Sequence, residues 1–237
     1  MKFSGTPQAS LGNPYSINET DPSASLGQVI FADDGAKYVY ALNGAVALVR
    51  GALCQSAIED TGDQNIAAVA TAIGATSIVT AAMTVTKNQY AGGYVTVTVT
   101  PGLATKYRIK QHEAFTSAAA TFLLEDTLQV ALTSSSRLDF VANPCNGVLV
   151  NPTTATGTVV GVAVNALTAG QYGWLQTWGI AAVTNDAAGA MVVGDAIMPS
   201  SSVAGAVRVQ VAGKRIVGQM MAGVASGEVG TAFLTIS

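Results

Sequence analysis

The stretch Tyr94-Val95-Thr96-Val97-Thr98-Val99-Thr100 decides the fold class, because hydrophobic and polar residues alternate strictly along it. Successive side chains of a β-strand point to opposite faces of the sheet, so the three valines face one way and the tyrosine and threonines face the other. Pro101-Gly102 ends the stretch with a pair of residues typical of turns. The pattern predicts a β-strand with one buried and one exposed face.

Short runs of the same kind continue on both sides of this strand, and turn-forming residues such as Asp33-Asp34-Gly35 separate them. Only residues 65–73, which are rich in alanine, are expected to form a helix. Many short strands in a chain with 25 glycines predict a mainly-β protein made of one or two small antiparallel sandwich or barrel domains. The expected strands are 28–32, 37–42, 75–86, 94–100, 106–110, 122–132, 138–141, 147–150, 158–164, 173–178, 180–183, 196–198, 206–211, 214–224 and 231–236.

Composition divides the chain into three expected parts: an extended N-terminal arm over 1–27, a β-rich domain over 28–155 and a C-terminal barrel or sandwich over 156–237. The arm is rich in proline and serine, and its apolar residues follow no regular period. It is either a disordered tail or a segment that orders on a neighbouring subunit, with Phe3, Leu11 and Tyr15 as anchors. We expect that deleting residues 1–27 leaves the β domains folded and weakens binding to the larger shell on which the protein docks.

Charged residues make up only 11% of the chain, against about 25% in an ordinary soluble domain. Eleven Lys and Arg residues and a formal net charge of −3 argue against binding nucleic acid through its phosphates. The uncharged stretches 64–86 and 140–185 have weakly apolar content or are broken by Gly and Pro, so no membrane span is expected. Residues 1–12 have no apolar core, so no secretory signal is expected either. A shortage of charge instead favours subunit interfaces, and therefore a homo-oligomer.

Residues capable of catalysis or metal binding are few and scattered. His112 is the one histidine, and no nucleophile motif accompanies it, so we expect an exposed histidine near a turn. Cys54 and Cys145 lie far apart in the sequence and are expected to be buried thiols. The acidic group at 59–63 has too few ligands for a calcium loop and is expected to be a solvated turn. The sequence therefore predicts no catalytic residues, no metal and no cofactor.

The aromatic cluster Tyr172, Trp174 and Trp178 is the densest chemical feature of the chain. On a regular strand these three even-numbered residues would share one face. That face is either part of the core or a stacking and subunit-contact surface, because Trp and Tyr dominate the strongest contacts of interfaces. Nucleic-acid stacking is disfavoured, since no basic residue lies between Asp139 and Arg208.

Several segments together resemble virion structural proteins of tailed bacteriophages, in particular head decoration (cement) proteins. The segments that carry the resemblance are 172–183, 193–200, 215–219 and 232–236, with 88–94, 107–110 and 143–148. The resemblance covers most of the chain after the arm and implies no active-site residues. It implies a β-rich homo-oligomer, a trimer in preference to a dimer, that is made in the host cytoplasm. This oligomer would bind the major capsid protein on the outside of the virion and stabilise the head.

Low charge, many strands and an extended arm agree with this function, because docking at many sites on a lattice lets weak contacts suffice. A tail or baseplate component of the virion is the main alternative. An enzyme such as a hydrolase is a weaker hypothesis, because the chain has one histidine and no paired catalytic motif. A non-viral surface-layer or adhesin-like protein would be expected to carry a signal peptide.

Overall fold

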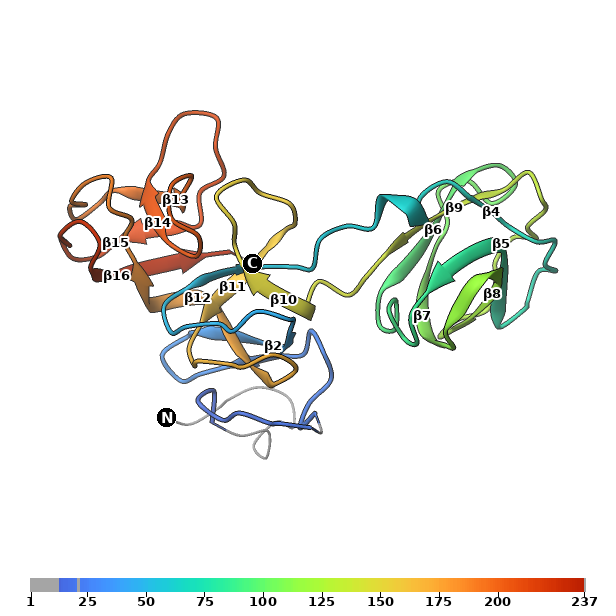
Figure 1. Ribbon diagram of the computed structural model, residues 1–237, viewed down its shortest axis with the longest axis horizontal. Helices are drawn as coiled ribbons and strands as arrows, with labels where there is room; N and C mark the ends of the chain where they lie inside the picture. Colours follow the sequence, from blue (N-terminus) through green and yellow to red (C-terminus); the bar gives the residue numbers. More distant parts are fainter. Residues whose placement is uncertain (1–12, 21, 237) are drawn as a thin grey trace. The chain divides into compact units, whose positions relative to one another are not determined.

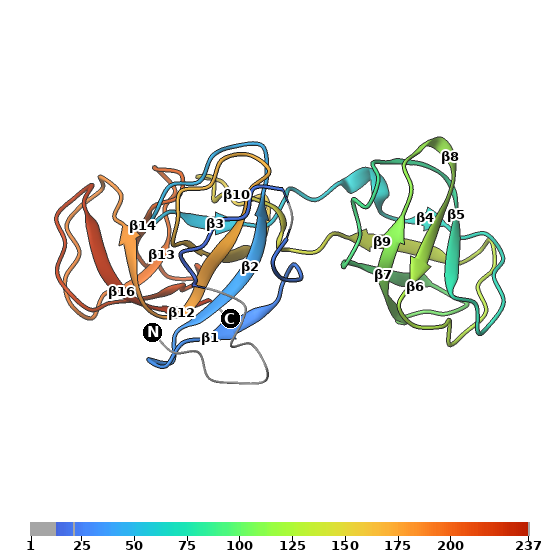
Figure 2. The ribbon, with the colours of Figure 1, turned by 90° about the horizontal axis from the view of Figure 1, so that it is seen from below.

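The computed structural model describes residues 13–20 and 22–236, and their regular structure is almost entirely β (Figures 1 and 2). The predicted mainly-β fold with barrel-like domains is confirmed. The chain forms two units: residues 59–143 make unit 2, which is inserted between the two halves of unit 1 at 58 and 144.

The expected domain boundary at 155/156 is therefore not where the structure divides. The reason is strand pairing across the insertion, because strands that precede unit 2 in the sequence pair with strands that follow it. β2 (Lys37–Asn43) pairs with β12 (Tyr172–Thr184), and β3 (Leu53–Gln55) lies between β10 (Asn146–Val150) and β11 (Val159–Ala163).

Unit 2 is a nearly closed six-stranded antiparallel barrel, drawn from cyan to yellow-green in Figure 1. A backbone bridge between Ala68 and Thr80 joins the two edge strands of the sheet and almost completes the ring. Phe122 and Phe140 are fully buried at the centre of its core. In sheet order, its strands are β4 (Ile66–Ala67), β9 (Arg137–Val141), β6 (Tyr94–Val99), β7 (Lys106–His112), β8 (Phe115–Leu124) and β5 (Ser77–Val85).

The alternating stretch forms β6, and its first two valines behave as the pattern predicts. Val95 and Val97 are fully buried in the barrel core. Val99 is 41% exposed, which corrects the expectation for the third valine. The register with β9 shifts between Val97 and Val99, and such a shift breaks the strict alternation of faces.

The helix expected over 65–73 is wrong. This segment contains β4 and the bridge that closes the barrel, and Thr71 pairs with Leu132. Asn65 adopts a φ of 58°, which a helix does not allow. Barrel closure buries Ala68 and satisfies backbone groups, and this tertiary effect outweighs the modest helix propensity of the alanines.

Unit 1 begins with a closed ring of five strands in the order β2, β10, β3, β11 and β12, with β12 returning to β2. The β10–β2 pair is parallel and the other pairs are antiparallel. Leu48, Leu167 and Leu175 are buried inside this ring. The short strand β1 (Val29–Phe31) pairs with residues 37–39 of β2, so the hairpin expected around Asp33-Asp34-Gly35 is present.

The long strand β12 continues into a second group of strands (orange to red in Figure 1), whose apolar core also includes Leu53, Val159 and Val162 of the ring. Between Gln176 and Trp178 the register with β2 shifts, and Gly179 follows with a φ of +91°. A Cβ at Gly179 would lie 3.0 Å from the Ala36 Cα, so both the backbone angle and the close approach favour glycine there. In order from β12, the further strands are β16 (Val229–Thr235), β15 (Gly218–Met220), β13 (Ala196–Pro199) and β14 (Val207–Val209).

The expected arm boundary at residue 27 lies too far along the chain. Ala24 and Leu26 pack against the core of unit 1, and the Gly27 N–H donates to the Tyr40 carbonyl oxygen at 2.9 Å. Asn18 forms a β-bridge with Tyr172. Deleting residues 1–27 would therefore remove part of unit 1 itself, which corrects the expectation that all of these residues lie outside the β domains. Packing against aromatic residues far along the chain holds this proline-rich segment, and local composition does not reveal such contacts.

Candidate functional site

Two of the predicted aromatic residues belong to a stack that closes the core of unit 1. The Tyr40 ring lies parallel to that of Tyr172, with centroids 5.9 Å apart, and at 4.9 Å from that of Trp174. Trp174 is fully buried. The Tyr40 hydroxyl donates to the Asn18 side chain at 3.1 Å and accepts from the Ser23 N–H at 3.1 Å. Of the two interpretations of this cluster, the core is therefore the correct one for Trp174.

Trp178 lies on the other face of the strand, so the expectation of one shared face is wrong. Trp174 pairs with Tyr40 of β2, whereas Trp178 pairs with Lys37, three positions away. Residues that pair directly share a face, and positions three apart on a strand lie on opposite faces. The register shift that precedes Gly179 causes the reversal, and the amino-acid pattern alone did not indicate it.

Around Trp178 there is a partly exposed group that we name the aromatic–lysine patch, made of Phe31, Lys37, Trp178, Ile180 and Phe233, in which Phe31 and Ile180 are exposed and the other three are half-buried. The Lys37 Nζ lies 5.2 Å from the Trp178 ring centroid and 5.7 Å from that of Phe31. Phe233 meets Trp178 edge-on at 5.5 Å and pairs directly with Ile180. Phe31 is 44% exposed and Ile180 is 58% exposed. Four strands of unit 1 thus present a rigid apolar surface with one cation at its centre.

Of the three residues predicted to anchor the N-terminal arm, one lies in the part of the chain that the structure describes. Tyr15 is exposed, on the segment that precedes the Asn18 bridge. Phe3 and Leu11 lie outside the described residues.

His112 is buried, which corrects the expectation of an exposed histidine. Its Nε2 accepts the Tyr90 N–H at 3.0 Å, and its Nδ1 lies 2.9 Å from the Glu113 carbonyl oxygen. These partners assign the proton to Nδ1 in a neutral ring. Burial lowers the pKa of His112, since the charged ring is poorly solvated there. Because both ring nitrogens are bonded to the backbone, this side chain positions a loop rather than transferring protons.

The acidic turn that precedes β4 is solvated at Glu59 and Asp60 but not at Asp63, which corrects that part of the expectation. The Asp63 carboxylate accepts a hydrogen bond from the Tyr90 hydroxyl, and Asp63 is only 4% exposed. Burial raises the pKa of Asp63, and burial together with the carboxylate raises the pKa of Tyr90. Asp63, Tyr90 and His112 thus fasten the segment entering unit 2 to the barrel.

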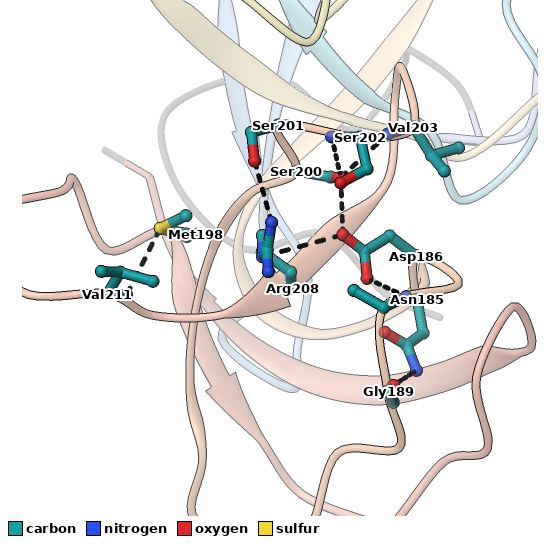
Figure 3. A network of polar contacts seen from close by, with 11 residues as sticks. Asn185, Asp186, Gly189, Met198, Ser200, Ser201, Ser202, Val203, Arg208 and Val211 are labelled. Carbon is teal, nitrogen blue, oxygen red and sulfur yellow. Dashed lines mark hydrogen bonds and ion pairs between the residues drawn. The ribbon is translucent and has the colours of Figure 1, made fainter.

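A second buried polar network was missed by sequence reasoning and ties the end of β12 to the loop between β13 and β14 (Figure 3). Asp186 accepts from the Ser200 hydroxyl at 2.7 Å and from the Ala188 N–H at 2.9 Å. The Arg208 Nε lies 3.8 Å from the same carboxylate. Ser200 in turn accepts the N–H groups of residues 202 and 203, both at 3.0 Å.

This network is structural rather than catalytic. Asp186 is 1% and Ser200 is 2% exposed, and the bonds of the Ser200 hydroxyl hold two turns together. The only sequence signal was the pair Asn185-Asp186 directly after a strand, where Asn and Asp side chains commonly bond to nearby backbone.

Both cysteines are buried thiols and form no disulfide, as expected. Burial raises the pKa of Cys54 to about 12 and that of Cys145 to about 11. Among the described residues, no group of three or more His, Cys, Asp or Glu side chains could hold a metal ion. Over the same part of the chain, no helix is long and apolar enough to cross a membrane.

Comparison with known proteins found no matching family model, no matching curated protein and no matching solved structure.

Proposed function

We propose that this protein is a virion structural component of a tailed bacteriophage. In this proposal it is a homo-oligomeric decoration protein that binds the outer surface of the major capsid lattice and stabilises the head. The sequence resemblance suggests the class. The observation that carries the proposal is the aromatic–lysine patch: large apolar side chains, some exposed and some half-buried, on four paired strands of a chain with only 11% charged residues.

Such a surface suits binding to a lattice better than turnover of a substrate. Exposed aromatic residues on a rigid sheet lose little conformational entropy when a partner covers them, and they contribute strongly to interfaces. Each lattice contact can be weak, because further contacts of an oligomer are made at high effective concentration.

Particle composition tests the proposal directly. Quantitative mass spectrometry of purified virions is expected to give a copy number comparable to that of the major capsid protein. Heads assembled without the protein are expected to lose heat resistance, and adding the purified protein back should restore it. A handful of copies per particle would instead indicate a tail or baseplate component, and absence from particles would refute both.

The oligomeric state is a separate test. Light scattering coupled to size-exclusion chromatography is expected to give a trimer mass. A monomer at all concentrations, with no affinity for shells, would contradict the proposal.

A further inference from the structure

Unit 1 contains the same arrangement of strands twice. The first copy is the closed five-strand ring, and the second is the orange-to-red group of Figure 1, which a parallel bridge between Asn185 and Val207 closes onto the end of β12. In both copies the pair at this closure is parallel and the other four pairs are antiparallel. We name the second copy the second ring. In chain order, β2, β3, β10, β11 and the start of β12 correspond to the end of β12, β13, β14, β15 and β16.

The sequences of the two rings agree where their strands correspond. Residues 160–173, which contain the turn from β11 to β12, align without a gap with residues 217–230, which contain the turn from β15 to β16. Both stretches begin with Val-Gly and end with Gly. Gly170 and Gly227 occupy the same position in the two turns, and both adopt a φ of 78°. The turns are therefore alike in sequence and in backbone conformation.

Two equivalent asparagines hold these turns in the same way. The Asn43 Nδ2 donates to the Thr168 carbonyl oxygen at 2.8 Å, and the Asn185 Nδ2 donates to the Ala225 carbonyl oxygen at 2.9 Å. The backbone N–H groups of the two asparagines also donate to equivalent carbonyl oxygens, both at 2.8 Å. Agreement in strand order, pairing and hydrogen bonds indicates that unit 1 is a duplication of one module.

The first ring has a covered outer face. Tyr40 and Trp174 pair directly, are fully buried and belong to a cluster separate from the ring interior. The N-terminal segment of the chain buries them: Ala24 and Leu26 pack against this cluster, and the Ser23 N–H donates to the Tyr40 hydroxyl at 3.1 Å. An extended segment thus completes the first ring from outside.

The equivalent face of the second ring is open. Ala182 and Thr231 stand where the first ring has its paired tyrosine and tryptophan, and they pair directly in the same way. Both are exposed, as are Ile180 at 58% and Val229 at 61%, and Phe233 beside them is half-buried. We name these five residues the second outer face. A face that is covered in one ring is therefore exposed in its duplicate.

We infer that the second outer face binds residues 1–12 of a neighbouring copy, an inference that rests on the proposed homo-oligomer. The first ring shows that such a face accepts an extended N-terminal segment of this chain. Residues 1–12 precede that segment and contain the apolar residues Phe3 and Leu11 and one charged residue, Lys2. Twelve residues can span about 40 Å when extended, whereas a seven-residue strand such as β16 is only about 23 Å long.

The position of the described N-terminal segment favours a neighbouring copy as the source. This segment lies on the Trp174 face of β12, whereas Ile180 lies on the same face as Trp178, which is the opposite one. Each copy then supplies one donor segment and one acceptor face, which are different surfaces. Head-to-tail contacts of this kind can close into a ring, as the proposed trimer requires.

The test compares three variants by light scattering coupled to size-exclusion chromatography. The arm variant lacks residues 2–12 and keeps every residue that the structure describes. The face variant carries Ile180→Glu and Thr231→Glu, at two exposed positions of the second outer face. The matched control carries Val46→Glu and Val193→Glu, at residues that are 62% and 67% exposed in connections outside that face.

The native chain and the control are expected to give the mass of a trimer. The arm variant and the face variant should each give the mass of a single chain, a threefold decrease, because each lacks one side of the contact. Mixed in equal amounts, these two variants should form a dimer, since the intact arm of one fits the intact face of the other. Far-UV circular dichroism of all four proteins should match.

A second measurement depends on no substitution. A synthetic peptide of residues 1–12, added in excess to the native trimer, should compete for the second outer face and release single chains. A trimer that is insensitive to the peptide and to deletion of the arm would overturn the inference.

The outcomes separate this inference from the proposed function. If the arm variant or the face variant remains trimeric while virions contain the protein at high copy number, the inference is refuted and the proposed function stands. If both variants dissociate as expected but virions lack the protein, the inference stands and the proposed function is refuted. A native chain that is monomeric refutes the inference whatever the virions contain.

Other occupants of the face give different results. A mixture of the two variants that contains only single chains would overturn exchange between copies. Loss of shell binding by a face variant that is still trimeric would overturn a second copy in favour of a lattice protein.

Discussion

Units 1 and 2 are both built from small β-rings, but unit 2 is one continuous segment of the chain and unit 1 is made of two separated segments. Every pairing of unit 2 joins strands within residues 59–143. Unit 1 instead pairs β2 with β12 and β3 with β10 across the whole insertion. Since non-local pairings must wait for distant segments to meet, unit 2 can complete its core first and unit 1 only after its second half is present. The difference teaches that unit 2 can fold from one continuous segment, whereas unit 1 needs both of its segments.

The largest expected effect comes from truncating one central aromatic residue in each unit. Trp174→Ala should destabilise unit 1 by about 3–5 kcal/mol, and Phe122→Ala should destabilise unit 2 by a similar amount, because each leaves a cavity in a fully buried core. Each change should lower only its own transition in calorimetry. A joint shift of both transitions would show that the units unfold together.

Alkylation of the cysteine thiols can show which of the two unfolding transitions belongs to unit 1. Both cysteines lie in unit 1, so alkylation should follow the unit 1 transition and ignore that of unit 2. With Trp174→Ala, labelling should begin at lower denaturant than in the native chain. With Phe122→Ala its onset should not move.

The next effect concerns the buried network of unit 1. Asp186→Ala should cost about 1–3 kcal/mol, because the Ser200 hydroxyl and the Ala188 N–H lose a buried acceptor. Asp195→Ala is the matched control, since that carboxylate accepts the exposed Val192 N–H, and it should cost at most about 1 kcal/mol. Equal losses in urea titrations would contradict a structural role specific to Asp186.

A smaller effect is a pH dependence confined to unit 2, which holds the single histidine. The pKa of His112 is lowered from 6.5 by burial, so the unfolded chain binds a proton that the folded chain resists. The contribution of His112 to the stability of unit 2 should therefore fall as pH drops below about 6.5. The Asp63 carboxyl acts in the opposite direction, because its pKa is raised and folding favours its protonation.

Melts between about pH 7.5 and about pH 5.5 separate these contributions. His112→Gln should remove the histidine part of the slope and leave that of Asp63. The unit 1 transition should keep its midpoint in both proteins, and an equal slope there would rule out the assignment to His112.

The smallest expected effect is the loss of a cation–π contact, which can be compared at one lysine in each unit. Lys37 lies over two aromatic rings of unit 1, whereas Lys106 lies 5.0 Å from the Tyr94 ring alone in unit 2. Lys37→Gln should cost about 0.5–1 kcal/mol, and Lys106→Gln should cost less, because each exposed cation–π contact contributes little. Denaturant midpoints of the two single variants check the order, and a larger loss for Lys106→Gln would reverse it.

Sequence reasoning was reliable where the structure is local. The alternation in β6 correctly predicted that Val95 and Val97 are buried, and the turn at Asp33-Asp34-Gly35 correctly predicted a hairpin. It failed where a distant segment decides the outcome. The face of Trp178 depends on a register shift against β2, and residues 65–73 form a short strand and isolated bridges because they close a barrel.

The candidate surfaces were less predictable than the fold. The aromatic–lysine patch includes Phe31 and Phe233, which only the pairing of β1, β2, β12 and β16 brings to Trp178. The buried state of Asp63 and Asp186 likewise depends on partners that no spacing in the sequence identifies.

The position at which unit 2 is inserted into unit 1 bears on how this protein can evolve. β3 and β10 are antiparallel neighbours, with Cys54 opposite Val150, so they form the two arms of a hairpin whose connection is a whole domain. Chain ends that already lie close together can be joined by a few residues as readily as by many. Recombination could therefore add, exchange or remove the inserted module as a cassette while the host framework stays intact.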